Sequence, residues 1–363
     1  MSYAEAIPPS LFDLLGRSWS LGQPVRESRF SRAGETVAFR TDDGLALVAV
    51  PDPERPETRM RLAVDDGRRT IAPRRAKPRP VARATGTAGH VAAWGDKSFV
   101  TGLAGGGLAS VTPRGQVTPL RTPIKGPLAA IARDPTSCAV AAAAGRQVVL
   151  LPDDRDAPVQ TLDVPGEVVA LALSPDGRIL AAAQPRGVSL WRDGEALGVV
   201  EMDGPQNLFF SPCGRTLACP LAANALALVA MDDYTVEIVS DYPTPVASVT
   251  WTEDPPRVVT SGAFRVTAWE TQAGGLGEPV EAGKPGLVVV DRVAAHRGRR
   301  LVAAGYASGL VAIVRPGTRD ELVLRADGPA VTALAWSDDG GHLAIGDAGG
   351  GAALVALPAE LFK

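Results

Sequence analysis

The side chains that could support catalysis or metal binding are few and lie far apart along the chain. The three histidines, His90, His296 and His342, lack the short spacings that are typical of metal ligands. No Gly-x-Ser-x-Gly motif is present, and no serine or cysteine pairs with one of these histidines as a nucleophile with its base. The sequence therefore predicts no enzymatic activity, no cofactor and no metal.

Two glycine clusters, at residues 102–107 and 346–351, loosely fit the pattern of phosphate-binding loops. Each cluster joins two apolar segments that have the character of strands, whereas a nucleotide fingerprint requires a strand followed by a helix. The acidic run at residues 153–156 resembles half of a calcium loop, but it lacks the glycine and the distal glutamate. We interpret all three segments as turns.

Basic side chains gather in one segment, residues 67–83, which holds seven of them and no acidic residue. The whole chain has a formal net charge of −3, so the remainder carries −10. Three prolines favour an extended conformation for this segment. It is either a solvated insertion or a binding site for an acidic partner. The candidate residues are Arg68, Arg69, Arg74, Arg75, Lys77 and Arg79.

The composition limits the fold and the compartment. Among 363 residues, 45% are hydrophobic, and 39 Gly and 31 Pro interrupt the chain too often for long helices. No apolar run is long enough to span a bilayer, and the N-terminus does not resemble a signal peptide. Three cysteines are too few, and odd in number, for a disulfide framework. We expect a cytoplasmic protein, with no membrane partner.

An internal repeat predicts the elements that position these residues. Residues 168–191 and 330–355 share one order: an apolar strand, a Ser-x-Asp-Gly turn, a second apolar strand, a glycine-containing turn and a third strand. The module recurs eight times, with first turns near Gly34, Gly95, Pro135, Gly177, Gly214, Asp254, Gly298 and Gly340. A fourth, more polar strand is expected at residues 117–120, 159–162, 197–201, 236–239, 280–282 and 321–324. Trp94, Trp251 and Trp336 recur at the end of the first strand, where we expect them to pack against a neighbouring module.

The turns Ser174-Pro-Asp-Gly177, Ser211-Pro-Cys-Gly214 and Ser337-Asp-Asp-Gly340 resemble those of WD40-type β-propellers. Trp191 and Trp269 are placed where the family's third strand ends in Trp-Asp, and Gly89-His90 is similar to the Gly-His that precedes a blade. The resemblance covers nearly the whole chain, from about residue 17 to residue 357. It implies an all-β closed propeller of four-stranded blades. The module count favours eight blades, or seven if the first or second module is irregular.

Ring closure and domain organisation follow from the two ends of this pattern. Residues 17–22 precede the first module and resemble an outer strand, so we expect them to complete the last blade. We therefore divide the chain into an N-terminal extension, residues 1–16, and a single propeller domain, residues 17–363. Residues 65–88 form its basic insertion, which we expect to join an outer strand to the next inner strand. His90 is expected to make a structural hydrogen bond within its own blade.

The functional prediction is a non-enzymatic scaffold that binds another protein with an acidic surface. The turns between second and third strands should place Arg and Tyr side chains around one rim, with the insertion overhanging it. These rim residues are Arg40, Arg146, Arg186, Arg265 and Tyr306. We do not expect nucleic-acid binding, and we expect a monomer. The alternative is a propeller enzyme, or a binder of a small ligand or metal, with its site in the central channel, where Asp291 and Arg292 are the evident charged pair.

Overall fold

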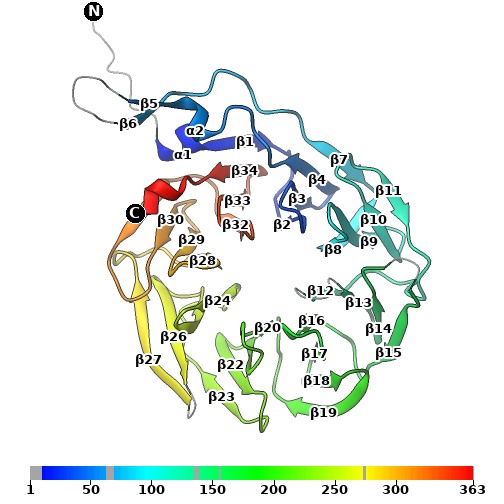
Figure 1. The fold of residues 1–363 in the computed structure, drawn as a ribbon. Coiled ribbons are helices and arrows are strands. Elements are labelled where there is room, and N and C mark those ends of the chain that lie inside the picture. Colours follow the sequence, from blue (N-terminus) through cyan, green and yellow to red (C-terminus); the bar gives the residue numbers. More distant parts are fainter. Residues whose placement is uncertain (1–9, 63–68, 135–138, 155–156, 273–274, 363) are drawn as a thin grey trace, which may run out of the picture.

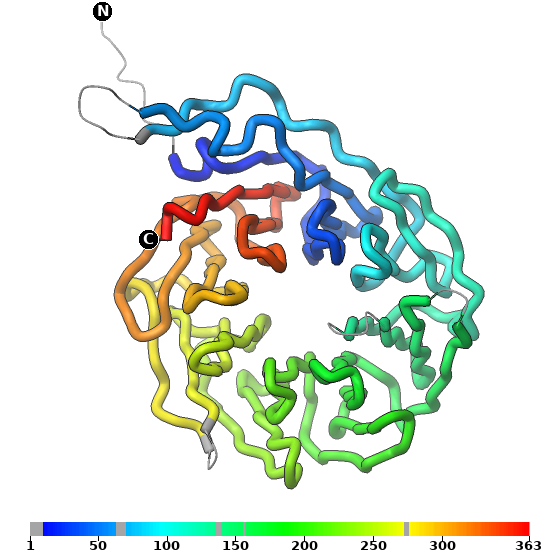
Figure 2. The backbone as a smooth tube through the Cα atoms, viewed as in Figure 1, coloured from blue at the N-terminus to red at the C-terminus, as the bar shows by residue number. Residues whose placement is uncertain are grey.

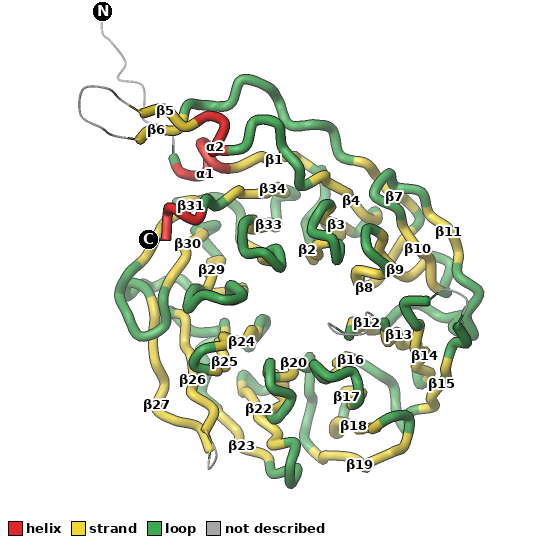
Figure 3. Tube along the Cα trace, in the orientation of Figure 1, coloured by secondary structure: helices red, strands yellow, loops and turns green. Residues whose placement is uncertain are grey.

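The computed structural model describes residues 10–62, 69–134, 139–154, 157–272 and 275–362. Its strands form eight four-stranded antiparallel blades around a central axis, which confirms the expected eight-bladed, all-β propeller (Figure 1). The chain runs once around the ring, so that its N-terminal and C-terminal parts lie side by side (Figure 2). The helical segments lie near this junction (Figure 3). None of the described helices is both long enough and apolar enough to cross a bilayer.

In each of the first four blades, the strand order runs from the channel to the outer edge. Blade 1 contains β2 (Glu27–Phe30), β3 (Thr36–Thr41), β4 (Gly44–Ala49) and β7 (Ala82–Thr85). Blade 2 contains β8 (Thr87–Trp94), β9 (Ser98–Leu103), β10 (Leu108–Val111) and β11 (Val117–Pro119). Blade 3 contains β12 (Ala130–Arg133), β13 (Val140–Ala144), β14 (Gln147–Leu151) and β15 (Gln160–Asp163). Blade 4 contains β16 (Ala170–Leu173), β17 (Ile179–Gln184), β18 (Gly187–Arg192) and β19 (Glu195–Glu201).

The next three blades repeat this order, and the outer strands confirm the six expected from the sequence. Blade 5 contains β20 (Phe209–Phe210), β21 (Thr216–Leu221), β22 (Ala225–Ala230) and β23 (Val236–Val239). Blade 6 contains β24 (Val249–Glu253), β25 (Pro256–Thr260), β26 (Val266–Gln272) and β27 (Gly275–Ala282). Blade 7 contains β28 (Val290–Ala295), β29 (Val302–Tyr306), β30 (Val311–Val314) and β31 (Glu321–Arg325).

Both ends of the chain build blade 8. It contains β32 (Val331–Trp336), β33 (His342–Asp347), β34 (Gly351–Ala356) and, as its outer strand, β1 (Gly16–Ser20). Antiparallel pairing runs from Gly16 opposite Val355 to Ser20 opposite Gly351, so the predicted closing strand is confirmed. Helix α1 (Leu11–Leu15) precedes β1, and the 3-10 helix η1 (Ala359–Phe362) follows β34.

The turn between the first and second strands has the same hydrogen bond in five blades. A Ser or Thr hydroxyl accepts from the backbone N–H five residues later, which fixes the hairpin. In blades 4 and 8 this turn carries the Ser-x-Asp-Gly motif. Glycine in this turn has φ near +70°, a conformation that other residues rarely adopt. The Pro135 turn lies outside the described residues. The hydroxyl–amide pairs are Ser31–Thr36, Ser174–Ile179, Ser211–Thr216, Thr252–Arg257 and Ser337–His342.

Small side chains let neighbouring blades pack closely. The second strands β13 and β17 are rich in alanine, and Ala141, Ala181 and Ala182 are fully buried. Ala141 packs in one cluster with Leu171 and Trp191 of the next blade. The interior therefore consists of apolar layers between successive blades, which is how a ring with little aromatic content fills its volume.

The recurring tryptophans contact neighbouring blades, as expected. The indole N–H of Trp251 donates to the Phe209 carbonyl of the preceding blade at 3.2 Å. Trp336 makes the corresponding bond to Ala294 at 3.0 Å, whereas Trp94 donates to Pro152 of the following blade at 3.1 Å. These residues connect blades and do not form a ligand cage.

The position expected for the basic insertion is wrong. Outer strand β7 follows the insertion, so residues 50–81 connect the third and fourth strands of one blade instead of joining two blades. This connection contains the short helix α2 (Pro56–Arg59) and the hairpin of β5 (Met60–Leu62) and β6 (Arg69–Ile71). The hairpin precedes β7, the true outer strand, and pairs only with itself.

Antiparallel topology therefore gives the ring two distinct faces. One face, here called the connection face, carries the turns between second and third strands and the links from each blade to the next. The other, here called the insertion face, carries the turns between first and second strands and the long connection of residues 50–81. The insertion consequently cannot overhang the predicted Arg rim, because the two lie on opposite faces.

Candidate functional site

A central channel of about 620 Å³ is lined by residues from seven blades. Six arginines and only two acidic side chains line it, together with His90, although the chain as a whole is acidic. Low-dielectric walls concentrate such a field inside a cleft. The channel is therefore a strongly basic concave surface. The charged residues are Arg26, Arg29, Arg40, Arg133, Arg292 and Arg297, with Glu27 and Asp338.

Glu27, at the start of β2, is surrounded by basic groups on one side of the channel. Its carboxylate lies 2.9 Å from Arg29, 3.5 Å from Arg40 and 3.3 Å from the Nδ1 of His90. Burial alone would raise the pKa of Glu27, but Arg29, His90 and Arg40 together lower it to about 2. The carboxylate is thus ionised and neutralises only part of the charge around it. The side-chain contact of His90 crosses from blade 2 to blade 1, whereas its backbone carbonyl accepts from the Thr101 hydroxyl within its own blade at 2.9 Å.

Arg292, in β28, lies on the wall formed by blades 7 and 8. Its Nε donates to the Thr332 carbonyl at 2.7 Å, and its Nη1 donates to the Asp291 carbonyl at 2.8 Å. Burial lowers the pKa of Arg292, although the nearby Asp291 opposes that shift. Arg292 faces the channel, whereas Asp291 is not among the lining residues. The two residues singled out from the sequence therefore do not form a side-chain ion pair there.

The predicted rim residues differ in how they are placed on the connection face. Arg146 and Arg186 are exposed in the turns after β13 and β17. The side chains of Arg40 and Arg265 are only 19% exposed and form ion pairs with Glu27 and Glu281. The prediction that Tyr306 lies on the rim surface is wrong. The residue is only 5% exposed, and burial raises the pKa of its hydroxyl to about 12. Its ring packs in the apolar layer between blades 6 and 7 because it ends the central strand β29.

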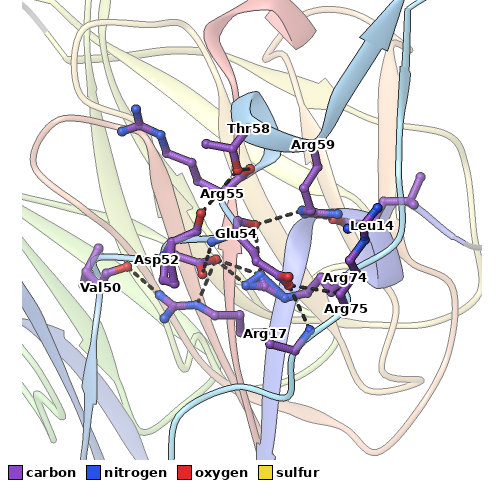
Figure 4. A network of polar contacts seen from close by, with 12 residues as sticks. Leu14, Arg17, Val50, Asp52, Glu54, Arg55, Thr58, Arg59, Arg74 and Arg75 are labelled. Carbon is purple, nitrogen blue, oxygen red and sulfur yellow. Dashed lines mark hydrogen bonds and ion pairs between the residues drawn. The ribbon is translucent and has the colours of Figure 1, made fainter.

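Some arginines of the insertion form ion pairs and hydrogen bonds within the protein (Figure 4). Arg74 pairs with Asp52, with its Nη1 at 2.7 Å from the carboxylate. Arg17, in the closing strand β1, donates to the Val50 carbonyl at 2.6 Å and lies 3.7 Å from the same Asp52. Burial would raise the pKa of Asp52, but Arg74, a backbone N–H and Arg17 together lower it. Blade 8 and blade 1 are thereby joined through one carboxylate.

Arg59, in α2, makes a second link at this junction. Its guanidinium donates to the carbonyls of Glu54 at 2.8 Å, Ala72 at 2.5 Å and Leu14 at 2.5 Å. Leu14 belongs to α1, so Arg59 connects the insertion to the segment that leads into the closing strand. No sequence pattern pointed to this role, because Arg59 lies outside the basic run of residues 67–83.

Three insertion residues keep exposed cationic side chains. Arg75, Lys77 and Arg79 are exposed on the insertion face, while the Glu54 carboxylate accepts the backbone N–H groups of Arg75 and Ala76. Of the other candidates, Arg68 lies outside the described residues, and Arg69 is described only as part of strand β6. The structure therefore does not gather all six predicted insertion residues into one surface.

An apolar patch on the connection face was missed by the sequence analysis. Phe264 is 43% exposed, Leu287 93% and Val288 38%. Gly262 and Ala263 exchange backbone hydrogen bonds with Val290, which holds the turn of blade 6 against the link into blade 7. We call Phe264, Leu287 and Val288 the apolar patch. No periodic pattern marks it, because all three residues lie outside strands.

No group of three or more His, Cys, Asp or Glu side chains in the described part of the chain is placed to hold a metal ion. Cys213 is exposed in a turn, and Cys219 is buried in β21, where burial raises its pKa to about 12. Cys138 lies outside the described residues.

Comparison with known proteins identifies an architecture. No protein-family model matches the chain, and no curated protein matches its sequence. Among solved structures, 1627 chains are similar. One is a crystal structure of the computationally designed Ika8 protein, with a TM-score of 0.66 and 17% sequence identity over 95% of this chain and 99% of that one. A likeness at this identity establishes the eight-bladed β-propeller fold and carries no function with it.

Proposed function

We propose that this protein is a non-enzymatic scaffold of the WD40 type that binds another protein through its connection face. The observation that carries the proposal is the apolar patch, three exposed hydrophobic side chains on two segments that backbone hydrogen bonds between residues 262–263 and Val290 hold together. Single exposed hydrophobic residues are ordinary, but adjoining ones are typical of interaction sites. The WD40 assignment is supported by the Ser/Thr turn bond, which recurs in five blades.

Charge on the same face supports an acidic partner. Arg146 and Arg186 are exposed there, and the mouth of the basic channel opens between the blades. Complementary charge accelerates association and selects among partners, while buried apolar anchors contribute most of the affinity. In this proposal the apolar patch anchors the partner and the arginines orient it.

The insertion has a different part in this proposal. Its buried arginines hold the ring closure, and its exposed Arg75, Lys77 and Arg79 lie on the opposite face. We assign partner binding to the connection face alone. A cytoplasmic location and a monomeric state before binding belong to the same proposal and are supported by composition.

The test compares substitutions on the two faces. Tagged wild-type protein is used to capture interacting proteins from extracts of its native cells, and the affinity of the purified partner is then measured. Replacing Phe264 and Leu287 by Asp should weaken binding at least tenfold, because an apolar anchor is lost and a charge would be desolvated. The matched control is Leu62→Asp, which alters a side chain that is 66% exposed on the insertion face.

The expected result is loss of the partner with F264D/L287D and retention with L62D. Arg146→Glu and Arg186→Glu should mainly slow association, and this effect should shrink at high salt. Equal binding by all variants, or loss only on charge reversal of Arg75, Lys77 and Arg79, would contradict the assignment of the connection face.

A further inference from the structure

The basic channel has a charge excess that the chain's own residues do not neutralise. Arg26 pairs with Asp42 at 2.9 Å, and Arg297 pairs with Asp338 at 3.2 Å. Glu27 then serves both Arg29 and Arg40. Arg292 has only backbone carbonyls as hydrogen-bond partners among the described residues. If the charged side chains of the channel served only to neutralise one another, positive and negative charges would be matched in number.

The excess lies on one side of the channel. Blades 7, 8, 1 and 2 are consecutive around the ring, and they carry Arg292, Arg29, Arg40 and His90. Two hydrogen bonds link Arg292 to the segment that precedes β2. Arg292 donates to the Thr332 carbonyl at 2.7 Å, and the Thr332 hydroxyl donates to the Val25 carbonyl at 2.5 Å. Val25 lies two residues before Glu27. Arg292 is thus held by the backbone of blade 8, which is tied in turn to the segment that leads into β2.

The part of the channel wall formed by blades 5 and 6 is uncharged. Blades 5 and 6 contribute Asn207, Phe209, Ser248 and Thr250 to the channel lining. The hydroxyls of Ser248 and Thr250 are already engaged by the backbone N–H groups of Val293 and Ala295, both at 3.1 Å. Arg133 of blade 3 also lines the channel, so the uncharged stretch of the lining is confined to blades 5 and 6.

The donors that remain are suited to anionic oxygen atoms. The side chain of Arg29 is 53% exposed and that of His90 is 49% exposed. The Nη2 of Arg292 makes no hydrogen bond to any residue that the structure describes. Guanidinium groups match the geometry of phosphate and carboxylate oxygens, and hydrogen bonds between charged partners are stronger than those between neutral ones. A volume of about 620 Å³ admits a small molecule.

We infer that the central channel binds a small polyanion, carrying phosphate or carboxylate groups, against the wall formed by Arg292, Arg29 and His90. The bound anion neutralises the positive charge that remains after Glu27 has paired with its basic neighbours. The inference does not depend on the proposed scaffold function. Its residues line the channel, whereas the apolar patch lies outside it.

The experiment titrates the intact protein with pyrophosphate and, separately, with citrate, using isothermal calorimetry in phosphate-free buffer of low ionic strength. These two probes distinguish a phosphate ligand from a carboxylate one. We expect one site per chain, with affinity that falls as salt is added. Arg292→Gln and Arg29→Gln should each weaken binding at least tenfold, because each removes a charged hydrogen-bond donor.

Arg319→Gln is the matched control, since Arg319 is an exposed arginine on the outer side of blade 7. It changes the net charge equally and should alter affinity less than twofold. Arg29→Gln is included because the side chain of Arg29 is half exposed, so that its replacement should not disturb folding. Circular dichroism shows whether each variant is folded. No binding of either probe, or equal weakening by Arg319→Gln and Arg292→Gln, would overturn the proposal.

Discussion

Glu27 is the one acidic side chain among three basic groups at the inner edge of blade 1. Its pKa of about 2 lies below the ordinary value of 4.5, because Arg29, His90 and Arg40 outweigh the opposing effect of burial. A depressed pKa means that ionised Glu27 stabilises the fold above pH 4.5, and that this contribution disappears as the pH falls towards 2.

We therefore expect Glu27→Gln to lower the free energy of unfolding at neutral pH by roughly 2–3 kcal/mol, since the buried carboxylate is the counter-charge of Arg29, His90 and Arg40. The difference from wild type should shrink steadily below pH 4.5. Urea unfolding at several pH values measures it. Glu195→Gln, an exposed position in β19, should change stability by less than about 0.5 kcal/mol at any of them. Equal stability of Glu27→Gln and wild type at pH 7 would contradict the role given to this cluster.

The insertion acts on the closure of the ring through individual hydrogen bonds. Arg59 donates to three carbonyls, one of them in α1, and its side chain is largely buried. We expect Arg59→Ala to cost about 2–4 kcal/mol of stability, because the carbonyls lose charged donors in a buried place. Thermal and urea unfolding give this value, and Arg75→Ala, an exposed neighbour in the same insertion, should have almost no effect. A neutral Arg59→Ala variant would show that the insertion is only a solvated loop.

At the scale of elements, strand β1 protects the edge of β34. Removing residues 1–20 would leave blade 8 with three strands and expose a row of unpaired backbone groups on β34. We expect this truncation to oligomerise or aggregate, whereas wild type and a truncation of residues 1–9 remain monomeric. Size-exclusion chromatography with light scattering distinguishes the outcomes. A monomeric, thermally stable protein without residues 1–20 would mean that the closing strand is dispensable.

The repeat predicted these elements well because each blade carries its own local signals. Glycine in the first turn and apolar runs on both sides of it define a hairpin wherever they occur, as at Gly177 and Gly340. The outer strand of blade 1 was misplaced for the converse reason. The segment Ala82–Thr85 has alternating small and polar residues and becomes a strand only because β4 lies beside it. The insertion before it was therefore assigned to the wrong connection and the wrong face.

At the scale of the whole molecule, the channel could not be predicted from local patterns. Its charged residues come from blades 1, 3, 7 and 8, between Arg26 and Asp338 in the sequence, and only ring closure brings them together. The apolar patch was missed for a similar reason, since Phe264 and Leu287 are 23 positions apart and lie outside strands. Tyr306 shows the opposite error: a residue placed on the rim by its position in a turn is buried by the neighbouring blade.

The central claim is that a partner protein binds to one of the two faces of the ring, the connection face. Hydrogen–deuterium exchange of the protein with and without its purified partner tests this most directly, because it reports protection along the whole backbone. We predict slower exchange on the connection face, at residues 262–265 and 284–289 and in the turns around Arg146 and Arg186, with no change at residues 72–80. Protection confined to the insertion, or to the outer strands, would contradict the claim.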